Sequence, residues 1–156
     1  MRKTYLFIVA LCCVFFSEAQ TYEYQVITSV ESIIPSGAGR SRLISTKEAR
    51  NYQDFTSERT DGKKTKDKRN KSDRSEIRVK NFEETKLLNF FNIAGIRFQN
   101  IAANDAVITS KINTMSSDGW ELAFVTSAVE SDAGKNDGKG IFITRYIFKK
   151  LKRIKK

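Results

Sequence analysis

The sequence predicts an α+β fold in which an antiparallel sheet of three or four strands packs two helices on one face. Three features indicate this: an alternating stretch near the start, two stretches with helical spacing of apolar residues, and two β-rich runs joined by a glycine-rich loop. The expected strands are 22–32, 40–45, 120–129 and 141–149, and the expected helices lie near 82–94 and 104–118.

The first strand follows from a period of two between Tyr22 and Val30. The alternating set is Tyr22, Tyr24, Val26, Thr28 and Val30. Aromatic residues at this spacing are expected to line a core, and a platform for stacking a ligand is the alternative. The glycine-rich segment 35–39 then breaks the strand, and residues 40–45 form the returning arm of a hairpin.

The first expected helix opens with Asn81 and Glu84, which are spaced as in a capping box. Its apolar stripe is Leu87, Leu88, Phe91 and Ala94. Gly95 follows the stripe and is expected to end the helix in a left-handed conformation.

The second expected helix begins at Asn104, which is read as its N-cap, with Asp105 next to the positive helix end. The residues expected to be buried are Val107, Ile108, Ile112 and Met115. Asp118 and Gly119 close the helix.

The last two strands enclose a polar, glycine-rich loop at residues 131–140, which predicts a long hairpin. A short echo relates this region to the first hairpin, since Thr28 to Ser32 resembles Thr126 to Ser131. Duplication of a hairpin and coincidence are both open explanations. Within the loop, Asp132, Asn136 and Asp137 offer oxygen ligands, but their spacing departs from a calcium loop, so a solvated hairpin tip is expected.

Residues 1–19 are expected to be a bacterial-type cleavable signal peptide. Arg2 and Lys3 precede an apolar run of about a dozen residues, which is short for a membrane span of roughly 20. Ser17 and Ala19 are small residues at the cleavage-site positions, so cleavage is expected before Gln20. The protein is therefore predicted to be secreted or periplasmic, without a lipid anchor and without a membrane span after cleavage.

Cleavage would leave 137 residues without cysteine or histidine, because both cysteines lie in the signal segment and the chain has no histidine. Disulfide bonds are thereby excluded from the mature domain. A chain of this length suffices for one hydrophobic core. One α+β domain is expected over residues 20–150, followed by a basic tail at 151–156.

The formal charge of +10 is concentrated in two segments. Residues 59–80 contribute +6 and residues 145–156 contribute +7, and the rest of the mature chain is mildly acidic. Because residues 56–76 contain no apolar side chain, we expect a disordered basic insertion at about 56–75. Weak, nonspecific contacts with polyanions are expected from Lys63, Lys64, Lys66, Lys68, Arg69, Lys71, Lys149, Lys150, Lys152, Arg153, Lys155 and Lys156.

The residue inventory argues against most catalytic chemistry. Without histidine or mature cysteine, the common general base and the thiol nucleophile are missing, and the usual zinc sites are excluded. No nucleotide-binding glycine pattern occurs either, and no cofactor or metal is expected. Catalysis by a carboxylate pair stays open through Asp118, Glu121 and Glu130.

Three short motifs resemble a family of small bacterial domains of unknown function. They are the Tyr-x-Tyr-x-Val strand at 22–26, the sequence Gly119, Trp120, Glu121, Leu122, and the final strand with its aromatic and basic end at 143–150. The closest similarity is to a secreted Bacteroidetes-type branch. The resemblance implies an α+β fold and supplies no activity. From the residues themselves, Gly119 ends a helix, Trp120 and Leu122 point inward, and Glu121 points outward.

These observations favour an exported, noncatalytic module that binds or scaffolds an unknown partner in the envelope or outside the cell. The alternative from another class is a carboxylate-dependent enzyme that acts on an envelope glycan.

Overall fold

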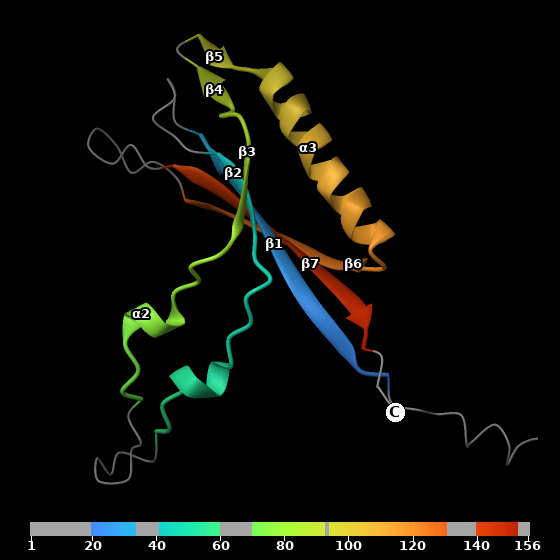
Figure 1. The fold of residues 1–156 in the computed structure, drawn as a ribbon. Coiled ribbons are helices and arrows are strands. Elements are labelled where there is room, and N and C mark those ends of the chain that lie inside the picture. The colour runs from blue at the N-terminus through green and yellow to red at the C-terminus, as the bar shows by residue number, and fades with distance from the viewer. Residues whose placement is uncertain (1–19, 34–40, 60–69, 93, 131–139, 153–156) are drawn as a thin grey trace, which may run out of the picture.

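A five-stranded antiparallel sheet forms the centre of the computed structural model, which describes residues 20–33, 41–59, 70–92, 94–130 and 140–152. Along the sheet the strands follow the order β3-β2-β1-β7-β6 (Figure 1). They are β1 (Tyr22–Ser32), β2 (Arg42–Ser45), β3 (Glu83–Lys86), β6 (Glu121–Glu130) and β7 (Ile141–Leu151). A separate two-stranded sheet pairs β4 (Phe91–Asn92) with β5 (Gly95–Ile96).

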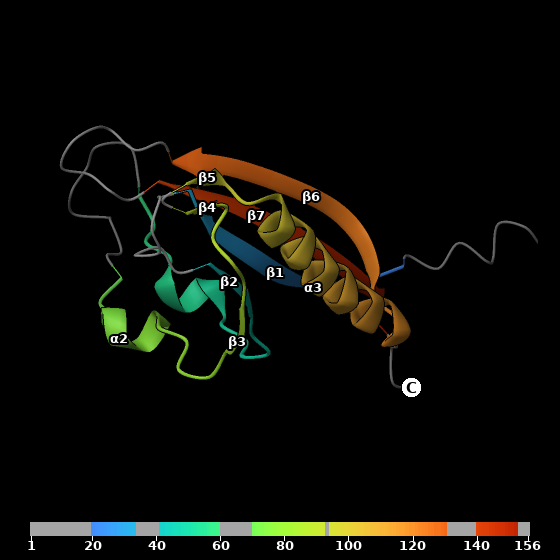
Figure 2. The same cartoon turned by 90° about the horizontal axis from the view of Figure 1, so that it is seen from above.

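One long helix, α3 (Phe98–Ser117), lies across one face of the sheet (Figures 1 and 2). Two single-turn helices, the 3-10 helix η1 (Tyr52–Phe55) and α2 (Arg74–Ile77), lie between β2 and β3 in the sequence. The prediction of two helices on a sheet of three or four strands is therefore wrong. The described residues form five strands in the main sheet and a single helix of more than one turn.

The two expected hairpins are present, and a third pairing joins them. β1 pairs with β2, and β6 pairs with β7, both antiparallel. β1 also pairs with β7 along its whole length, from Tyr22 opposite Leu151 to Ser32 opposite Ile141. The two ends of the domain therefore lie side by side, and β7 is the middle one of the three long strands.

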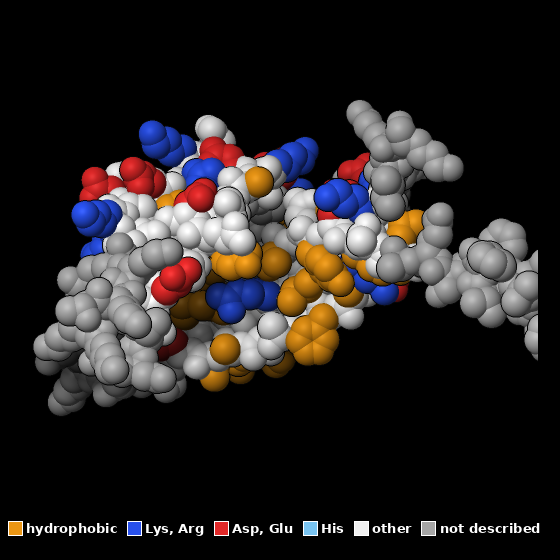
Figure 3. All heavy atoms as spheres, turned by 90° about the horizontal axis from the view of Figure 1, so that it is seen from below, with side chains coloured by type: hydrophobic (Ala, Val, Ile, Leu, Met, Phe, Trp, Pro, Cys, Tyr) orange, Lys and Arg blue, Asp and Glu red, His pale blue; other side chains and the backbone are white. Residues whose placement is uncertain are grey.

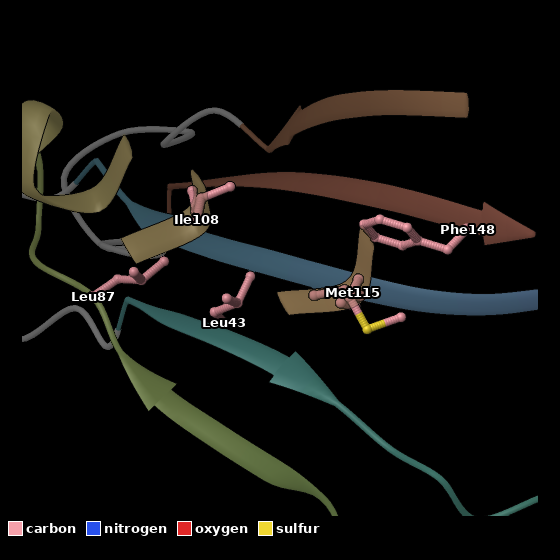
Figure 4. Packing of buried hydrophobic residues seen from close by; sticks show 6 residues of the cluster. Leu43, Leu87, Ile108, Met115 and Phe148 are labelled. Atoms are coloured by element: carbon pink, nitrogen blue, oxygen red, sulfur yellow. The ribbon is translucent and has the colours of Figure 1, made fainter. Parts of the chain in front are cut away.

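The core lies between α3 and one face of the sheet (Figure 4). Its buried members are Ile27, Leu43, Leu87, Ile108, Met115 and Phe148. Val107, Ile112, Trp120 and Tyr146 pack against them while half-buried. The apolar stripe expected on the second helix faces the core: Ile108 and Met115 are buried in it, and Val107 and Ile112 are half-buried against it.

The C-terminal end of α3 is a Schellman motif, as the sequence at Gly119 predicts. Gly119 has φ +83°, its N–H donates to the Ser116 carbonyl at 2.9 Å, and the Trp120 N–H donates to the Met115 carbonyl at 3.0 Å. Trp120 and Met115 both belong to the core cluster, which matches the apolar contact that accompanies this motif.

The expected helix at 82–94 is wrong. Residues Glu83–Lys86 form the edge strand β3, and an extended segment leads from it into the β4–β5 hairpin. Glu84 accepts from the Arg42 guanidinium and Glu83 accepts from Ser45 at 3.0 Å, so both acids serve strand pairing instead of a helix cap. Gly95 has φ +114°, but it lies in the hairpin and does not end a helix.

The second helix begins six residues before the predicted start. It opens at Phe98, and Asn104 is fully buried inside it instead of capping it. An apolar stripe does not reveal this extra turn and a half, since none of the residues 98–103 is buried.

Several expectations fall on residues outside the described ranges: the signal peptide at 1–19, the loop with Asp132, Asn136 and Asp137, and positions 60–69 of the basic insertion. The described flanks of the insertion are joined, since the Asn70 N–H donates to the Ser57 hydroxyl at 3.0 Å. Among the described residues, no helix has the length and apolar character to cross a membrane.

Candidate functional site

The face of the sheet opposite α3 is the candidate site, because no described helix covers it (Figures 1 and 2). Successive side chains of a strand point to opposite faces. On β1 the residues facing α3 are Ile27, Ser29 and Glu31, all buried, and Glu31 accepts a hydrogen bond from Asn104 of the helix. Tyr22, Tyr24, Val26, Thr28 and Val30 therefore lie on the opposite face, which we call the open face.

The register of the three long strands gives the open face a regular order. Across β1, β7 and β6, the first row is Val26, Ile147 and Phe124, the second is Thr28, Arg145 and Thr126, and the third is Val30, Ile143 and Ala128. Directly opposite residues have Cβ atoms about 4.5–5.5 Å apart. On these three strands a polar row thus lies between two apolar rows, with Arg145 in its middle.

Large apolar side chains on the open face are exposed to solvent. Tyr24 is 64% exposed and Phe124 is 62% exposed, and Tyr22, Val26 and Leu151 are also exposed. Seen from below, hydrophobic side chains gather around basic ones on this side of the molecule (Figure 3). A contiguous exposed apolar surface of this kind marks an interaction site in soluble domains.

The tyrosines therefore do not line the core, which corrects the first expectation for this strand. The alternating set from Tyr22 to Val30 faces away from α3. The less apolar residues between them face the helix and include the buried Ile27. The second expectation, an aromatic platform, agrees with the exposed position of Tyr22 and Tyr24.

The basic residues of the open face differ in whether an acidic side chain neutralises their charge. Arg42 is paired with Glu84, and Lys149 lies 3.2 Å from Glu121 and 5.3 Å from the centre of the Tyr22 ring. Arg145 is exposed and makes no hydrogen bond or ion pair with any described residue. On the open face of the adjacent strand β6, the acids Glu121 and Glu130 are each four strand positions from Arg145, or about 13 Å.

The sequence Gly119, Trp120, Glu121, Leu122 serves the turn from α3 into β6. The Lys150 ammonium donates to the Asp118 carbonyl at 2.6 Å and lies 5.7 Å from the centre of the Trp120 ring, so one lysine covers both the helix end and the indole. Trp120 is half-buried against the core, Glu121 pairs with Lys149 on the opposite face, and Leu122 is partly exposed. The motif is thereby explained by packing.

Most residues expected to contact polyanions lie outside the described ranges. These are Lys63, Lys64, Lys66, Lys68, Arg69, Arg153, Lys155 and Lys156. Of the others, Lys71 and Lys152 are exposed, whereas Lys149 and Lys150 are occupied by the contacts given above. The structure therefore brings no set of these residues together into a described site.

The three candidate catalytic carboxylates do not converge. Glu121 and Glu130 are the first and last residues of β6, which places them about 30 Å apart along the strand. Asp118 caps the end of α3, on the turn that precedes β6. A retaining or inverting glycosidase needs two carboxyl groups roughly 5–9.5 Å apart, which the Glu121 and Glu130 pair does not offer.

A shallow hollow of about 450 Å³ lies between α3 and the strands β2 and β3. It is lined by Leu43, Thr85, Ala106, Val107, Ser110, Lys111 and Thr114. The Lys111 ammonium crosses from α3 to Glu83 at 2.8 Å, and this hydrogen bond, together with that from Ser45, lowers the pKa of the Glu83 carboxyl. The ion pair connects α3 to the edge strand β3, and neither the Lys111 nor the Glu83 charge is left unpaired for a ligand.

Metal binding has no support in the described part of the chain, where no three candidate ligands gather. Comparisons of the chain with protein-family models, with curated proteins and with solved structures gave no match.

Sequence reasoning missed Arg145 as a site residue and counted it only within the basic C-terminal segment. One sequence feature concerned its neighbours. The similar segments Thr28 to Ser32 and Thr126 to Ser131 each begin with a threonine, and these two threonines lie on either side of Arg145. Cross-strand register, which sets these three residues in one row, cannot be read from either segment alone.

Proposed function

We propose that the mature chain is an exported, noncatalytic module that binds a partner through the open face of its sheet. The observation that carries this proposal is the exposure of Tyr24 and Phe124 near Arg145, which pairs with no described acid, on a face that no described helix covers. Sheets in small domains normally bury one face against another layer. Here α3 covers one face, and the other is both apolar and accessible.

The export part of the proposal rests on residues 1–19 and their basic, apolar and small-residue regions. It places the partner in the periplasm or outside the cell. Mass spectrometry of the exported protein tests it directly, with Gln20 expected as the first residue. Material that retains residues 1–19 would contradict it.

The binding part is tested by comparing the mature protein with a variant that carries Tyr24→Ser and Phe124→Ser. A control variant carries Asn113→Ser on the outer surface of α3, where the side chain is also exposed. Each protein is used to capture partners from the envelope fraction, and the captured species is then purified and titrated. We expect the wild type and the control to bind it, and the face variant to lose most of the affinity, because aromatic anchors dominate interface energies.

Retention of the same affinity by the face variant would overturn the open face as the binding surface. Urea denaturation should first show that the unfolding free energies of all three proteins agree within about 0.5 kcal/mol, as expected for exposed positions. Loss of binding then reports on the surface and not on folding.

A further inference from the structure

We infer that the row formed by Thr28, Arg145 and Thr126 recognises a carboxylate of an apolar polypeptide segment that lies on the open face. This inference rests on the proposed function and adds the chemistry of the partner. It starts from one observation: Arg145 is an exposed cation surrounded by apolar rows, and no described acid compensates it.

The row has the chemistry of an anion site. A guanidinium presents five N–H donors in a planar fork that matches two carboxylate oxygens. Thr28 and Thr126 are the residues directly opposite Arg145 on the two neighbouring strands, so a hydroxyl lies on each side of it. Both hydroxyls can donate to the same bound anion.

The surroundings of the row specify what the carboxylate must be attached to. Ile143 and Ile147 precede and follow Arg145 on the open face of β7, and Val26 and Phe124 continue one of the apolar rows on the adjacent strands. A small free anion would leave these side chains in water. A polypeptide segment in which an aspartate or glutamate is flanked by aliphatic or aromatic side chains covers these apolar side chains and also neutralises the Arg145 charge.

The dimensions of the face fit one segment of polypeptide. The three long strands, about 4.8 Å apart and 10–11 residues long, form a surface roughly 14 Å wide and 35 Å long, and β2 and β3 extend it at one edge by only four residues each. That width accommodates one helix of about 10–12 Å diameter or a pair of strands. The area of roughly 500 Å² is below the ~800 Å² that each partner buries in a standard interface between folded domains.

The charge of Arg145 argues against two other occupants of the open face, a second copy of the chain and a lipid surface. A second copy packed face to face about a two-fold axis through the middle of the sheet would bring two Arg145 side chains together, because Arg145 lies near the middle of the central long strand. A lipid surface would place the guanidinium and both threonines at the depth of the apolar rows, which costs about 2.5–3.5 kcal/mol for an arginine in the apolar interior. A protein carboxylate removes this penalty.

The test uses a displayed library of random peptides, selected on the full mature protein. We expect the selected peptides to share one acidic residue flanked by apolar residues. With one such peptide, Arg145→Met should weaken binding at least about tenfold, and Arg145→Lys should weaken it less. Lys149→Met is the matched control on the same strand and face, and its effect should be smaller because Glu121 already compensates that charge.

A charge exchange makes the assignment specific. The Arg145→Glu variant should lose the acidic peptide and should bind the same peptide with lysine in place of its acidic residue. Selection of peptides without an acidic residue, or equal binding by Arg145→Met, would overturn the inference. So would Arg145-dependent binding to vesicles of phosphatidylcholine and phosphatidylglycerol, or a dimer in sedimentation that Arg145→Met abolishes or strengthens.

The two proposals fail in distinguishable ways. If the variant with Tyr24→Ser and Phe124→Ser loses the partner but Arg145→Met keeps it, the open face is the binding surface and the carboxylate is not its ligand. If neither variant changes binding, the partner lies elsewhere and both proposals are wrong.

Discussion

The side-chain amide of Asn104 pairs with both backbone polar groups of Leu88. The Leu88 N–H donates to Asn104 Oδ1 at 2.8 Å, and Asn104 Nδ2 donates to the Leu88 carbonyl at 2.8 Å and to Glu31 Oε2 at 2.9 Å. The amide thus takes the place of a neighbouring strand for the segment that leads from β3 to β4. One fully buried side chain connects α3, β1 and this segment.

Replacing Asn104 with leucine should lower the free energy of unfolding by about 2–4 kcal/mol. The variant keeps a similar volume but removes the Asn104 amide from the Leu88 backbone and from the buried Glu31 carboxylate. A buried polar group without its partner costs about 1–3 kcal/mol, and the total stays at the lower end because Leu88 is 41% exposed and Glu31 keeps the Ser29 hydroxyl. Urea denaturation measures the change. Asn113→Leu on the exposed side of the same helix is the control, and equal effects of the two substitutions would refute the role of the Asn104 amide.

Substituting Gly119 by alanine should cost about 1–2 kcal/mol, because its φ of +83° is unfavourable for a residue with a Cβ atom. The new Cβ would meet only the Lys150 side chain at 3.5 Å, an ordinary contact, so the cost comes from the backbone. Asparagine tolerates the left-handed region better, and Gly119→Asn should therefore be less destabilising than Gly119→Ala in urea. The reverse order would contradict this origin of the strain.

Trp120→Ala should cost about 2–3 kcal/mol, less than the 3–5 kcal/mol typical of a fully buried tryptophan. The indole is only half-buried, although it packs against the core and under the Lys150 ammonium. Trp120→Phe keeps much of this packing and should cost less. A midpoint of urea unfolding unchanged by Trp120→Ala would show that the indole contributes nothing to the core.

Above pH 10 the fold should lose stability through Tyr146. Burial raises the pKa of its phenol, the charges of Glu31 and Asp105 raise it further, and the hydrogen bond with Ser29 opposes them. Because the folded pKa lies above the unfolded value of about 10, this contribution is complete below pH 10 and is lost as the pH rises through the folded pKa.

The difference in unfolding free energy between wild type and Tyr146→Phe should therefore shrink or change sign between pH 8 and a pH above 10. Tyr52→Phe is the control for removal of a phenol hydroxyl, since Tyr52 is 73% exposed. Parallel behaviour of the two variants would exclude Tyr146 as the source.

The local sequence pattern was sufficient to predict the elements whose determining residues lie within one segment of the chain. The long strands, the two hairpin pairings and the stripe from Val107 to Met115 follow from periodicity, and the end of the helix follows from Gly119. These predictions rest on side-chain spacing and on a backbone conformation that glycine adopts readily.

The prediction of a helix at 82–94 was wrong because tertiary contacts override the helical spacing of the apolar residues in this segment. Leu87, Leu88 and Phe91 are spaced as on a helix, yet the backbone at Leu88 is held by Asn104 and the one at Leu87 donates to the Ser41 carbonyl at 3.0 Å. These partners are distant in sequence. Glu84 resembles a cap residue because its carboxylate is a hydrogen-bond acceptor, and in the structure the same carboxylate accepts from Arg42 on the neighbouring strand.

The candidate site could be predicted only in part. The alternation from Tyr22 to Val30 identifies a two-faced strand, but it does not say which face α3 covers, and the more apolar set is the exposed one. The placement of Arg145 between Thr28 and Thr126 depends on two strand registers. Register is set by long-range pairing, which a single segment does not encode.

The basic C-terminal tail should give weak, sequence-independent binding to polyanions that falls steeply with salt. Lys149 and Lys150 are occupied by Glu121 and by the Asp118 carbonyl, so we expect the binding to come from Lys152, which is exposed, and from the basic residues of the sequence that follow it. Each neutralised phosphate adds about 0.7–0.9 to the negative slope of log affinity against log salt.

The test is to titrate the mature protein with a heparin-like polymer and with DNA at low and at physiological salt, and to repeat both titrations with a chain that ends at Lys152. This end point keeps Leu151, which pairs with Tyr22, and the Lys152 N–H, which donates to the Thr21 carbonyl at 2.9 Å, so the sheet stays intact. Removing the three charges of Arg153, Lys155 and Lys156 should reduce the slope by up to about 2–3. Tight binding that survives physiological salt, or that distinguishes one polymer sharply from another, would instead show that these basic residues form a specific site.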